Sequence, residues 1–168
     1  MINFKDHIAA IPDFPSPGIL FRDISPLLRL HFSTVTDALG TLLSPAEWNA
    51  VDVVAGIDAR GFILAAALAV RFNKGFAPIR KQGKLPPPVV ARSYTLEYGA
   101  GTLEMKSGRG SVLIVDDVLA TGGTLAASVE LCSAAGYTVA GVVTLIDLKL
   151  NKESSIRGLR VRSLIQYD

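Results

Sequence analysis

Residues 112–124 read Val-Leu-Ile-Val-Asp-Asp-Val-Leu-Ala-Thr-Gly-Gly-Thr, an apolar run followed by two acids and then by a turn of small residues. A β-branched run without polar positions is typical of a strand that is buried on both faces, as in a parallel sheet covered by helices. The small residues come where this strand turns into a helix, which is predicted over residues 123–135 and ends at Gly136. The stretch therefore predicts an α/β fold with chemistry at the carboxyl end of this strand.

Strands and helices alternate on both sides of this stretch. Short apolar strands are predicted at residues 51–56, 76–79 and 138–146, and an Ala/Leu-rich helix at residues 61–72 joins the first two. Right-handed crossovers bring the carboxyl ends of parallel strands to one edge of the sheet, where ligands bind in such folds. We therefore expect a mostly parallel central sheet flanked by helices, with the functional residues at one edge.

Three segments depart from this alternation. Residues 1–30, with prolines at 12, 15, 17 and 26, predict an arm folded over the site rather than a part of the sheet. The alternation over residues 91–105 predicts a hairpin or mobile flap that turns at 97–101, and prolines 86–88 place a loop before it. Residues 160–167 predict an edge strand that closes the fold.

The composition bounds the class of protein. A chain of 168 residues with 49% hydrophobic and 19% charged residues predicts one compact domain over residues 1–168. The net charge of +2 favours neither nucleic acid nor a membrane surface as a partner.

The single Cys132 excludes an internal disulfide and indicates a reducing compartment, so we expect a cytoplasmic protein. The longest apolar run, residues 62–70, is too short to span a membrane, and Lys5 and Asp6 lie where a signal peptide would be apolar.

The small residues after the strand predict a phosphate site. Backbone N–H groups and hydroxyls at a helix N-terminus can surround a phosphate, and the helix dipole favours its negative charge. The turn in this chain consists of Ala120, Thr121, Gly122, Gly123 and Thr124. Just before it, the carboxylates of Asp116 and Asp117 can accept hydrogen bonds from a vicinal diol or support a hydrated Mg²⁺. A ribose 5-phosphate fits both features; the alternative is a solvated acid pair followed by a Gly-rich turn.

The stretch at 112–124 resembles the phosphoribosyl-pyrophosphate signature of the type I phosphoribosyltransferases. The motifs of nucleoside-triphosphate and dinucleotide sites, G-x-x-x-x-G-K-[ST] and G-x-G-x-x-G after a strand, are absent from the sequence. The resemblance implies the α/β fold of that family, with an N-terminal hood at about residues 1–30 and a flexible flap at about residues 82–106. It also implies a homodimer, Mg²⁺ as cofactor and phosphoribosyl pyrophosphate as substrate.

A second segment, Gly56-Ile-Asp-Ala-Arg-Gly-Phe62, looks like the pyrophosphate loop of the same family. This resemblance implies a cis peptide between Asp58 and Ala59, and a contact from Arg60, whose planar guanidinium matches phosphate oxygens. Two alternatives need no ligand: a turn in which Asp58 caps the next helix, and a solvated charged loop around residues 80–84. By the same resemblance, further pyrophosphate contacts come from Arg80, Lys81, Lys84 and Tyr98.

The resemblance is narrowed to the adenine-specific branch of the family by three further segments, residues 14–24, 79–86 and 93–99. It implies that Phe21 stacks on the purine and that backbone groups around Leu20 and Arg22 pair with the adenine edge. Such pairing would leave buried groups unpaired with guanine or hypoxanthine, which would select adenine. It also implies that Leu148 packs on the base. The alternative for Phe21 is an ordinary apolar residue that pins the N-terminal arm.

The implied reaction joins adenine N9 to C1 of the ribose as pyrophosphate leaves, and it produces AMP in purine salvage. The resemblance places Glu97 on the flap, where it would move a proton at purine N7 and contribute about 10²–10⁴-fold to the rate. Lys81 and Arg60 are the other implied catalytic residues, since they would neutralise the charge that grows on pyrophosphate. For Glu97 the alternative is an exposed charge on a hairpin.

Two other functions stay open. Some bacterial repressors use this fold to sense phosphoribosyl pyrophosphate without catalysis. Such a regulator needs a DNA-binding module, and only about fifty residues precede the first core strand. The same reaction on hypoxanthine, guanine or xanthine is a nearer alternative, against which the segment Leu20-Phe21-Arg22 stands.

Overall fold

The computed structural model describes residues 2–96, 99–150 and 155–167. The chain forms two compact units, residues 1–38 and residues 39–168. The first is longer than the arm predicted at about residues 1–30, because helix α1 (Ser25–Gly40) continues it. The organisation as one domain stays a prediction. In the described part of the chain, no helix is long and apolar enough to cross a membrane.

The N-terminal unit holds a small sheet of its own. A 3-10 helix, η1 (Phe4–His7), leads into β1 (Ala9–Ile11), which pairs antiparallel with β2 (Phe21–Asp23). In the connection, the ring of Phe14 meets the ring of Phe21 edge to face, with the ring centroids 5.1 Å apart. As predicted, the described residues of this segment add no strand to the main sheet.

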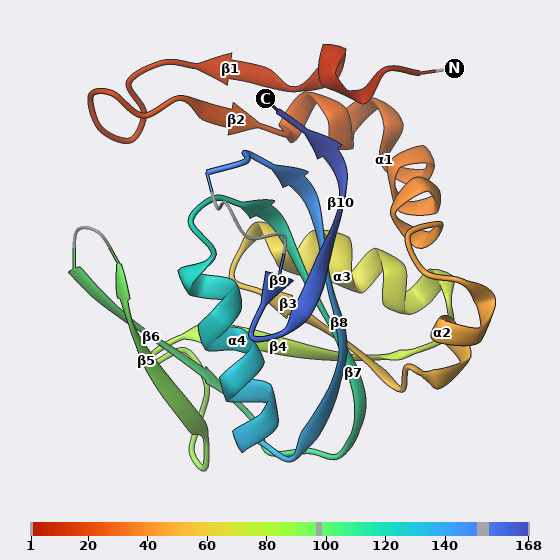
Figure 1. Cartoon of the computed structure of the whole chain (residues 1–168), viewed down its shortest axis with the longest axis vertical. Coiled ribbons are helices and arrows are strands. Elements are labelled where there is room, and N and C mark those ends of the chain that lie inside the picture. The colour runs from red at the N-terminus through yellow and green to blue at the C-terminus, as the bar shows by residue number, and fades with distance from the viewer. Residues whose placement is uncertain (1, 97–98, 151–154, 168) are drawn as a thin grey trace. The chain divides into compact units, whose positions relative to one another are not determined.

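The C-terminal unit is built on one mostly parallel sheet, as predicted (Figure 1). Its described strands lie in the order β5-β6-β4-β3-β7-β8-β10-β9. The parallel strands form the middle and are β3 (Val53–Ile57), β4 (Gly75–Lys81), β7 (Gly110–Leu119), β8 (Tyr137–Asp147) and β10 (Leu159–Gln166). The strands at the two edges are antiparallel to their neighbours and are β5 (Val90–Leu96), β6 (Gly99–Met105) and β9 (Ser155–Ile156). The carboxyl ends of the parallel strands therefore share one edge of the sheet.

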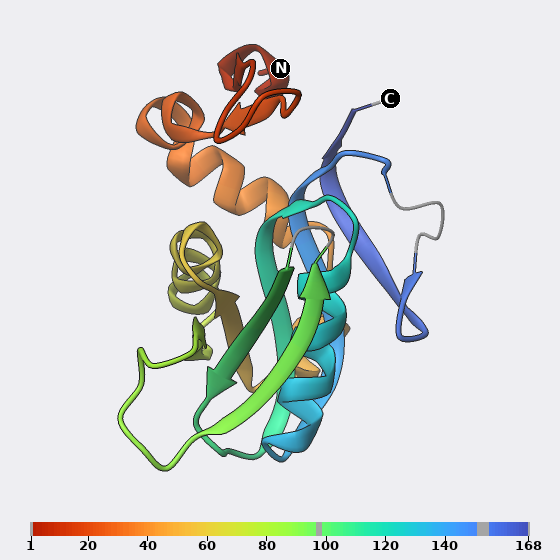
Figure 2. The same cartoon turned by 90° about the vertical axis from the view of Figure 1, so that its left-hand side faces the viewer.

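Helices cover both faces of this sheet. α3 (Arg60–Arg71) packs on β3 and β7, whereas α4 (Gly123–Ala134) packs on β8 and on the hairpin of β5 and β6. The two helices lie on opposite sides of the sheet in Figure 2. Because both faces are covered, residues 112–115 of β7 are apolar and at most 1% exposed. Cys132 of α4 is a small core residue, as its full burial shows, and burial raises the pKa of its thiol to about 12.

A short helix, α2 (Pro45–Ala50), lies between α1 and the sheet in the chain. It starts at a capping box: the Ser44 hydroxyl accepts from the N–H of Glu47, and the Glu47 carboxylate accepts from the N–H of Ser44. Trp48 stacks on Phe72 with the ring centroids 3.8 Å apart, and its indole N–H donates to the carbonyl oxygen of Gly40. These contacts fix α2 against the end of α3.

Two strands differ from the prediction. β7 does not end before the acids but continues to Leu119, because its last residues still pair with β8. β10 is not the edge strand, since β9 pairs with its first residues after a turn in which Gly158 has a φ of +78°. The hairpin predicted over residues 91–105 is present as β5 and β6, and it extends the sheet beyond β4.

Candidate functional site

The turn that connects β7 to α4 forms a cavity at the start of the helix. Gly122 is the N-cap residue of α4 and has a φ of +91°, a left-handed conformation that glycine adopts without strain. Within the described part of the chain no side chain caps this helix, so none of its side-chain oxygens takes up the N–H groups of the first turn as a cap. The cavity measures about 120 Å³ and is lined by Asp116, Val118, Ala120, Thr121, Gly122, Gly123, Thr124 and Leu125. The structure thus brings the predicted phosphate turn and the first acid into one cavity.

The two acids of β7 have different surroundings. Asp116 is half-buried, lines the cavity, and accepts a hydrogen bond of 2.9 Å at Oδ1 from the N–H of Asp117. Asp117 is only 5% exposed, and its Oδ2 lies 2.8 Å from Nε of Arg60. This contact has the distance of an ion pair, and no hydrogen-bond donor among the residues that the structure describes reaches this buried oxygen.

Burial and mutual repulsion oppose ionisation of this acid pair. Desolvation raises the pKa of Asp116 well above its ordinary value, and the charge of Asp117 adds to that rise. Desolvation also raises the pKa of Asp117, although the Arg60 guanidinium counteracts it. Ionising the pair therefore costs stability, and carboxylates perturbed in this way are typical of functional sites.

We expect Asp116→Asn to stabilise the folded protein at neutral pH. The folded protein binds more protons than the unfolded chain from the ordinary pKa of 3.8 up to the raised value, so wild-type stability falls as pH rises through that window. Asparagine keeps the oxygen that accepts from the N–H of Asp117 but carries no charge. Urea unfolding should show the variant more stable than the wild type at pH 7.5, with the gain in the free energy of unfolding shrinking toward pH 4. A gain that does not depend on pH would contradict this explanation.

The turn between β3 and α3 packs directly against the acids. As predicted, the peptide between Asp58 and Ala59 is cis. A side chain at position 61 would place its Cβ 2.9 Å from Oδ1 of Asp116, so Gly61 lets this turn approach the acids. Arg60 begins α3 and lies beside the acid pair, which confirms the prediction that it shares their edge of the sheet.

Basic residues follow at the end of β4. Arg80 donates from Nε to Oδ2 of Asp58 over 3.2 Å, and its guanidinium lies 5.6 Å from the ring centroid of Phe62. The alternative in which Asp58 caps α3 is wrong, because this helix has no side-chain cap and Asp58 pairs with Arg80 instead. Lys81 is the last residue of β4, and both it and Lys84 are exposed.

Glu104, which the sequence did not single out, organises this basic loop. It lies on β6 opposite Arg80 and is only 3% exposed. Its Oε1 accepts hydrogen bonds from the N–H groups of Lys84, over 2.8 Å, and Leu85, over 2.7 Å. Burial alone would raise the pKa of this carboxyl, but the backbone donors of residues 83–85 outweigh burial and lower it. In the sequence, a lone acid in an alternating strand cannot be told from an exposed charge.

The remaining predicted residues fall in three places. Leu148 follows β8, is half-buried, and donates its N–H to the carbonyl oxygen of Leu119 over 3.0 Å. It therefore lies at the same edge of the sheet as the acids. Leu20 belongs to the N-terminal unit, as do Phe21 and Arg22 of β2. Two predicted residues lie outside the described part of the chain: Glu97 and Tyr98.

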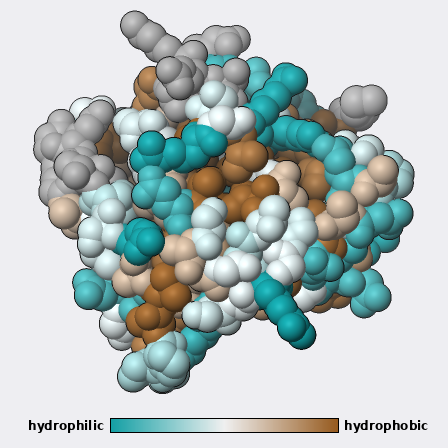
Figure 3. Space-filling view, turned by 60° about the horizontal axis from the view of Figure 1, so that its bottom comes forward, coloured by the Kyte–Doolittle hydropathy of each residue, from teal (hydrophilic) through white to brown (hydrophobic). Residues whose placement is uncertain are grey.

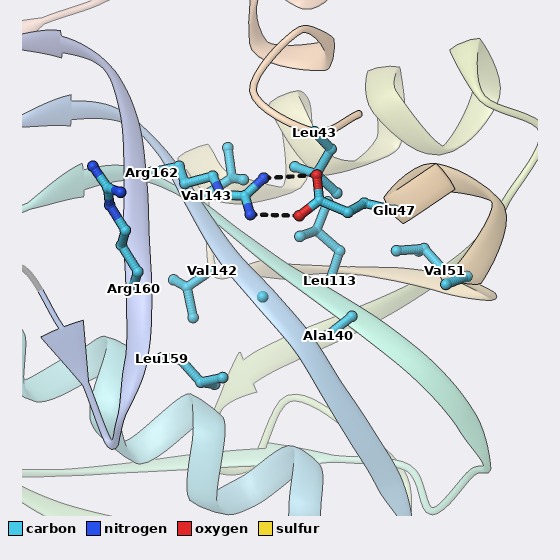
Figure 4. Close-up of a pocket in the computed structure, with 12 residues that line it drawn as sticks. Leu43, Glu47, Val51, Leu113, Ala140, Val142, Val143, Leu159, Arg160 and Arg162 are labelled. Atoms are coloured by element: carbon cyan, nitrogen blue, oxygen red, sulfur yellow. Dashed lines mark hydrogen bonds and ion pairs between the residues drawn. The ribbon is translucent and has the colours of Figure 1, made fainter. Parts of the chain in front are cut away.

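A second cavity, of about 210 Å³, lies between α2 and the strands β8 and β10 (Figure 4). Its lining is mainly aliphatic, and at one end Arg162 donates to both carboxylate oxygens of Glu47. Hydrogen bonds from Arg162 and Ser44 lower the pKa of Glu47 to about 2. None of the predicted site residues is among its described lining. We therefore place the candidate site at the first cavity, at the turn between β7 and α4, which we call the phosphate cavity because the predicted phosphate turn lines it.

The described residues suit a metal ion that arrives with a substrate. Among them, no group of three or more His, Cys, Asp or Glu side chains could hold a metal ion. Asp116 offers a carboxylate to the cavity, and a hard oxygen donor of this kind suits a hydrated Mg²⁺ whose other ligands would be water and phosphate oxygens. The donor set therefore fits a metal bound together with a phosphorylated ligand.

Comparisons with known proteins find relatives over nearly the whole chain. The family model "Phosphoribosyl transferase domain" matches residues 34–164. An adenine phosphoribosyltransferase from Hydrogenovibrio crunogenus is 50% identical over 163 residues, which cover 96% of this chain and 95% of the relative. Another, from Bdellovibrio bacteriovorus, is 49% identical and covers 99% of this chain and 100% of its own.

Crystal structures show the same similarity. The adenine phosphoribosyltransferase of Rhodothermus marinus superposes with a TM-score of 0.86 at 42% identity, covering 98% of this chain and 96% of its own. The enzyme of Saccharomyces cerevisiae, in a complex that contains adenine, superposes with a TM-score of 0.87 at 34% identity and covers 96% of both chains.

Proposed function

The chain belongs to the adenine phosphoribosyltransferases, and from this premise we propose that it transfers the 5-phosphoribosyl group of phosphoribosyl pyrophosphate to adenine. The products are AMP and pyrophosphate, so the reaction salvages a free purine base. One observation carries the assignment to this site: the uncapped start of α4 and the carboxylate of Asp116 line the same cavity. A 5'-phosphate in the turn would bring the ribose hydroxyls toward the acid pair.

The phosphate turn binds and orients the ribose end of the substrate in this proposal. Backbone N–H groups of residues 120–124 and the hydroxyls of Thr121 and Thr124 hold the 5'-phosphate, and the helix dipole favours its charge. The acid pair, Asp116 and Asp117, lies beside the ribose hydroxyls. Fixing the ribose at both ends presents C1 to the incoming base in one orientation.

Cationic side chains at the neighbouring strand ends serve the leaving group. As the bond from C1 to the pyrophosphate oxygen breaks, negative charge grows on pyrophosphate, and fixed positive charges nearby stabilise it. Mg²⁺ bound beside the acid pair would neutralise part of the pyrophosphate charge. The turn at Asp58 and Ala59 adds its backbone donors, and the proposed cationic and hydroxyl contacts are Arg60, Arg80, Lys81, Lys84 and Tyr98.

The base side of the reaction forms the bond from N9 of adenine to C1. We assign stacking on the purine to Phe21, edge pairing to the backbone around Leu20 and Arg22, and packing on the base to Leu148. Glu97 receives a proton at purine N7 in synthesis and returns it in the reverse direction. The hairpin of β5 and β6 would close over the site and exclude water, which would otherwise capture the oxocarbenium-like transition state.

Product analysis tests this function directly. Purified protein is mixed with phosphoribosyl pyrophosphate, Mg²⁺ and equimolar adenine, hypoxanthine, guanine, xanthine and orotate, and the nucleotides are identified by mass spectrometry. We expect AMP alone, because only adenine offers the edge that the backbone around Phe21 can pair. Another nucleotide would overturn the base site but keep the transfer reaction. Binding without any product would favour a sensor of phosphoribosyl pyrophosphate.

We also propose a homodimer, as the family resemblance implies. In the C-terminal unit, Ile63, Val70 and Phe76 are large hydrophobic residues with 43%, 84% and 42% of their surface exposed. Figure 3 shows hydrophobic patches between hydrophilic residues on the face that it presents. A second copy that covered Ile63 and Val70 of α3 and Phe76 of β4 would remove the exposed parts of these side chains from water. Light scattering of the wild type should give a molar mass twice that of one chain. Val70→Glu should lower the measured mass toward that of one chain. A wild type with the mass of a single chain would contradict the dimer.

A further inference from the structure

The two neighbouring acids of β7 occupy different environments, although the sequence makes them look equivalent. Successive residues of a strand point to opposite faces, so a ligand in one cavity meets the two side chains differently. Asp116 is half-buried and lines the phosphate cavity. Asp117 is only 5% exposed and is not among the described residues that line this cavity. A ribose seated in the cavity therefore reaches Asp116 first.

The surroundings of Asp117 point instead toward Arg60. Its Oδ2 lies 2.8 Å from Nε of Arg60, the first residue of α3, whose side chain is 35% exposed. This ion pair restrains the position of the guanidinium through its charge, although no directed hydrogen bond from a described residue to Asp117 Oδ2 accompanies it. A buried acid thus holds a partly exposed arginine at the edge of the site.

The turn that carries Arg60 is packed to keep this arrangement. A Cβ at Gly61 would lie 2.9 Å from both Oδ1 of Asp116 and the carbonyl oxygen of Val115. The backbone of the turn therefore lies directly against β7, and Arg60 has little room to move away from Asp117 as part of a loop shift. The pairing is a property of the packed turn and not of two mobile surface side chains.

We propose that the two acids divide the work of the site. Asp116 accepts the ribose hydroxyls, whereas Asp117 is a positioning residue that aims Arg60 at the pyrophosphate group. This division rests on the proposed function and specifies what each carboxylate does in it. It differs from the expectation that both acids bind the diol, and the difference can be measured with two ligands.

The test compares the binding of phosphoribosyl pyrophosphate and of AMP by calorimetry in the presence of Mg²⁺. Both ligands carry a ribose 5-phosphate, but only the first carries pyrophosphate. Asp117→Asn should weaken the binding of phosphoribosyl pyrophosphate roughly tenfold, as expected for the loss of one coupled contact. The affinity of this variant for AMP should stay within about twofold of the wild-type value. Asp116→Asn is the matched variant, and it should weaken both ligands by the same factor.

A double variant shows whether Asp117 acts through Arg60. Arg60→Ala alone should weaken the binding of phosphoribosyl pyrophosphate and leave the affinity for AMP unchanged. Asp117→Asn added to Arg60→Ala should have no further effect on either affinity. Should Asp117→Asn fail to fold, Asp117→Glu displaces the carboxylate by one methylene. It should likewise weaken the binding of phosphoribosyl pyrophosphate and leave the binding of AMP unchanged. Thermal unfolding checks that each variant is folded.

The possible outcomes separate this inference from the proposed function. If Asp117→Asn weakens AMP as much as phosphoribosyl pyrophosphate, Asp117 contacts the ribose and the division of work is wrong. Undiminished binding of phosphoribosyl pyrophosphate by this variant would overturn it as well. A wild type that binds neither ligand would instead contradict the proposed function.

Discussion

Replacing Glu97 with glutamine is expected to lower kcat about 10²–10⁴-fold, the usual contribution of a general acid or base, with little change in the affinity for phosphoribosyl pyrophosphate. As N9 of adenine attacks C1, positive charge builds on the purine, and a carboxylate at N7 relieves it by taking a proton. Glutamine has nearly the same shape but cannot take that proton. Steady-state kinetics with both substrates varied separate kcat from the two KM values.

A matched control is Glu130→Gln on α4. Glu130 comes seven residues after the start of the helix, or roughly 10 Å along its axis, and it forms an ion pair with Arg157. It is 43% exposed at its side chain, so the same loss of charge should leave kcat within twofold. A Glu97→Gln enzyme with a kcat within threefold of the wild type would remove Glu97 from the mechanism. A raised KM at unchanged kcat would assign it to binding.

Gly122→Val is expected to weaken the binding of phosphoribosyl pyrophosphate and AMP at least about 100-fold, which corresponds to roughly 2.7 kcal/mol. Gly122 has a φ of +91°, where a side chain costs about 1–2 kcal/mol. It also lines the cavity of about 120 Å³ in which the phosphate is proposed to sit. The methyl groups of valine would occupy that space, or the turn would relax and redirect its N–H groups. Isothermal calorimetry with both ligands measures the loss.

The control for backbone strain is Gly158→Val. Gly158 also has a positive φ, +78°, and a Cβ built there would have no heavy atom of a described residue within 4 Å, its two chain neighbours aside. Both variants should lose similar stability in urea unfolding, but only Gly122→Val should lose binding. If both lose binding equally, general strain explains the effect. Retained affinity in Gly122→Val would show that this turn does not hold the phosphate.

Much of the fold follows from local pattern. The apolar run at residues 112–115 and the small residues after Leu119 predict a buried strand, a turn and a helix, and β7 and α4 confirm them. The errors lie at strand ends and sheet edges. β7 runs on past the acids because β8 pairs with it, and β9 covers the start of β10. Both errors concern hydrogen bonds between paired strands. The hydrophobic periodicity within one segment does not show with which other strand that segment pairs.

The sequence by itself determined the chemistry available to this protein: a turn of small residues at a helix start, an acid pair before it, and arginines at the ends of neighbouring strands. Residue type and spacing suffice for these, because they reflect backbone conformation and charge. Only the tertiary structure decided that Asp117 is buried against Arg60 while Asp116 lines the cavity, and that Glu104 holds the basic loop. Burial and pairing are properties of side chains from different elements, so they exist only once the sheet has brought those elements together.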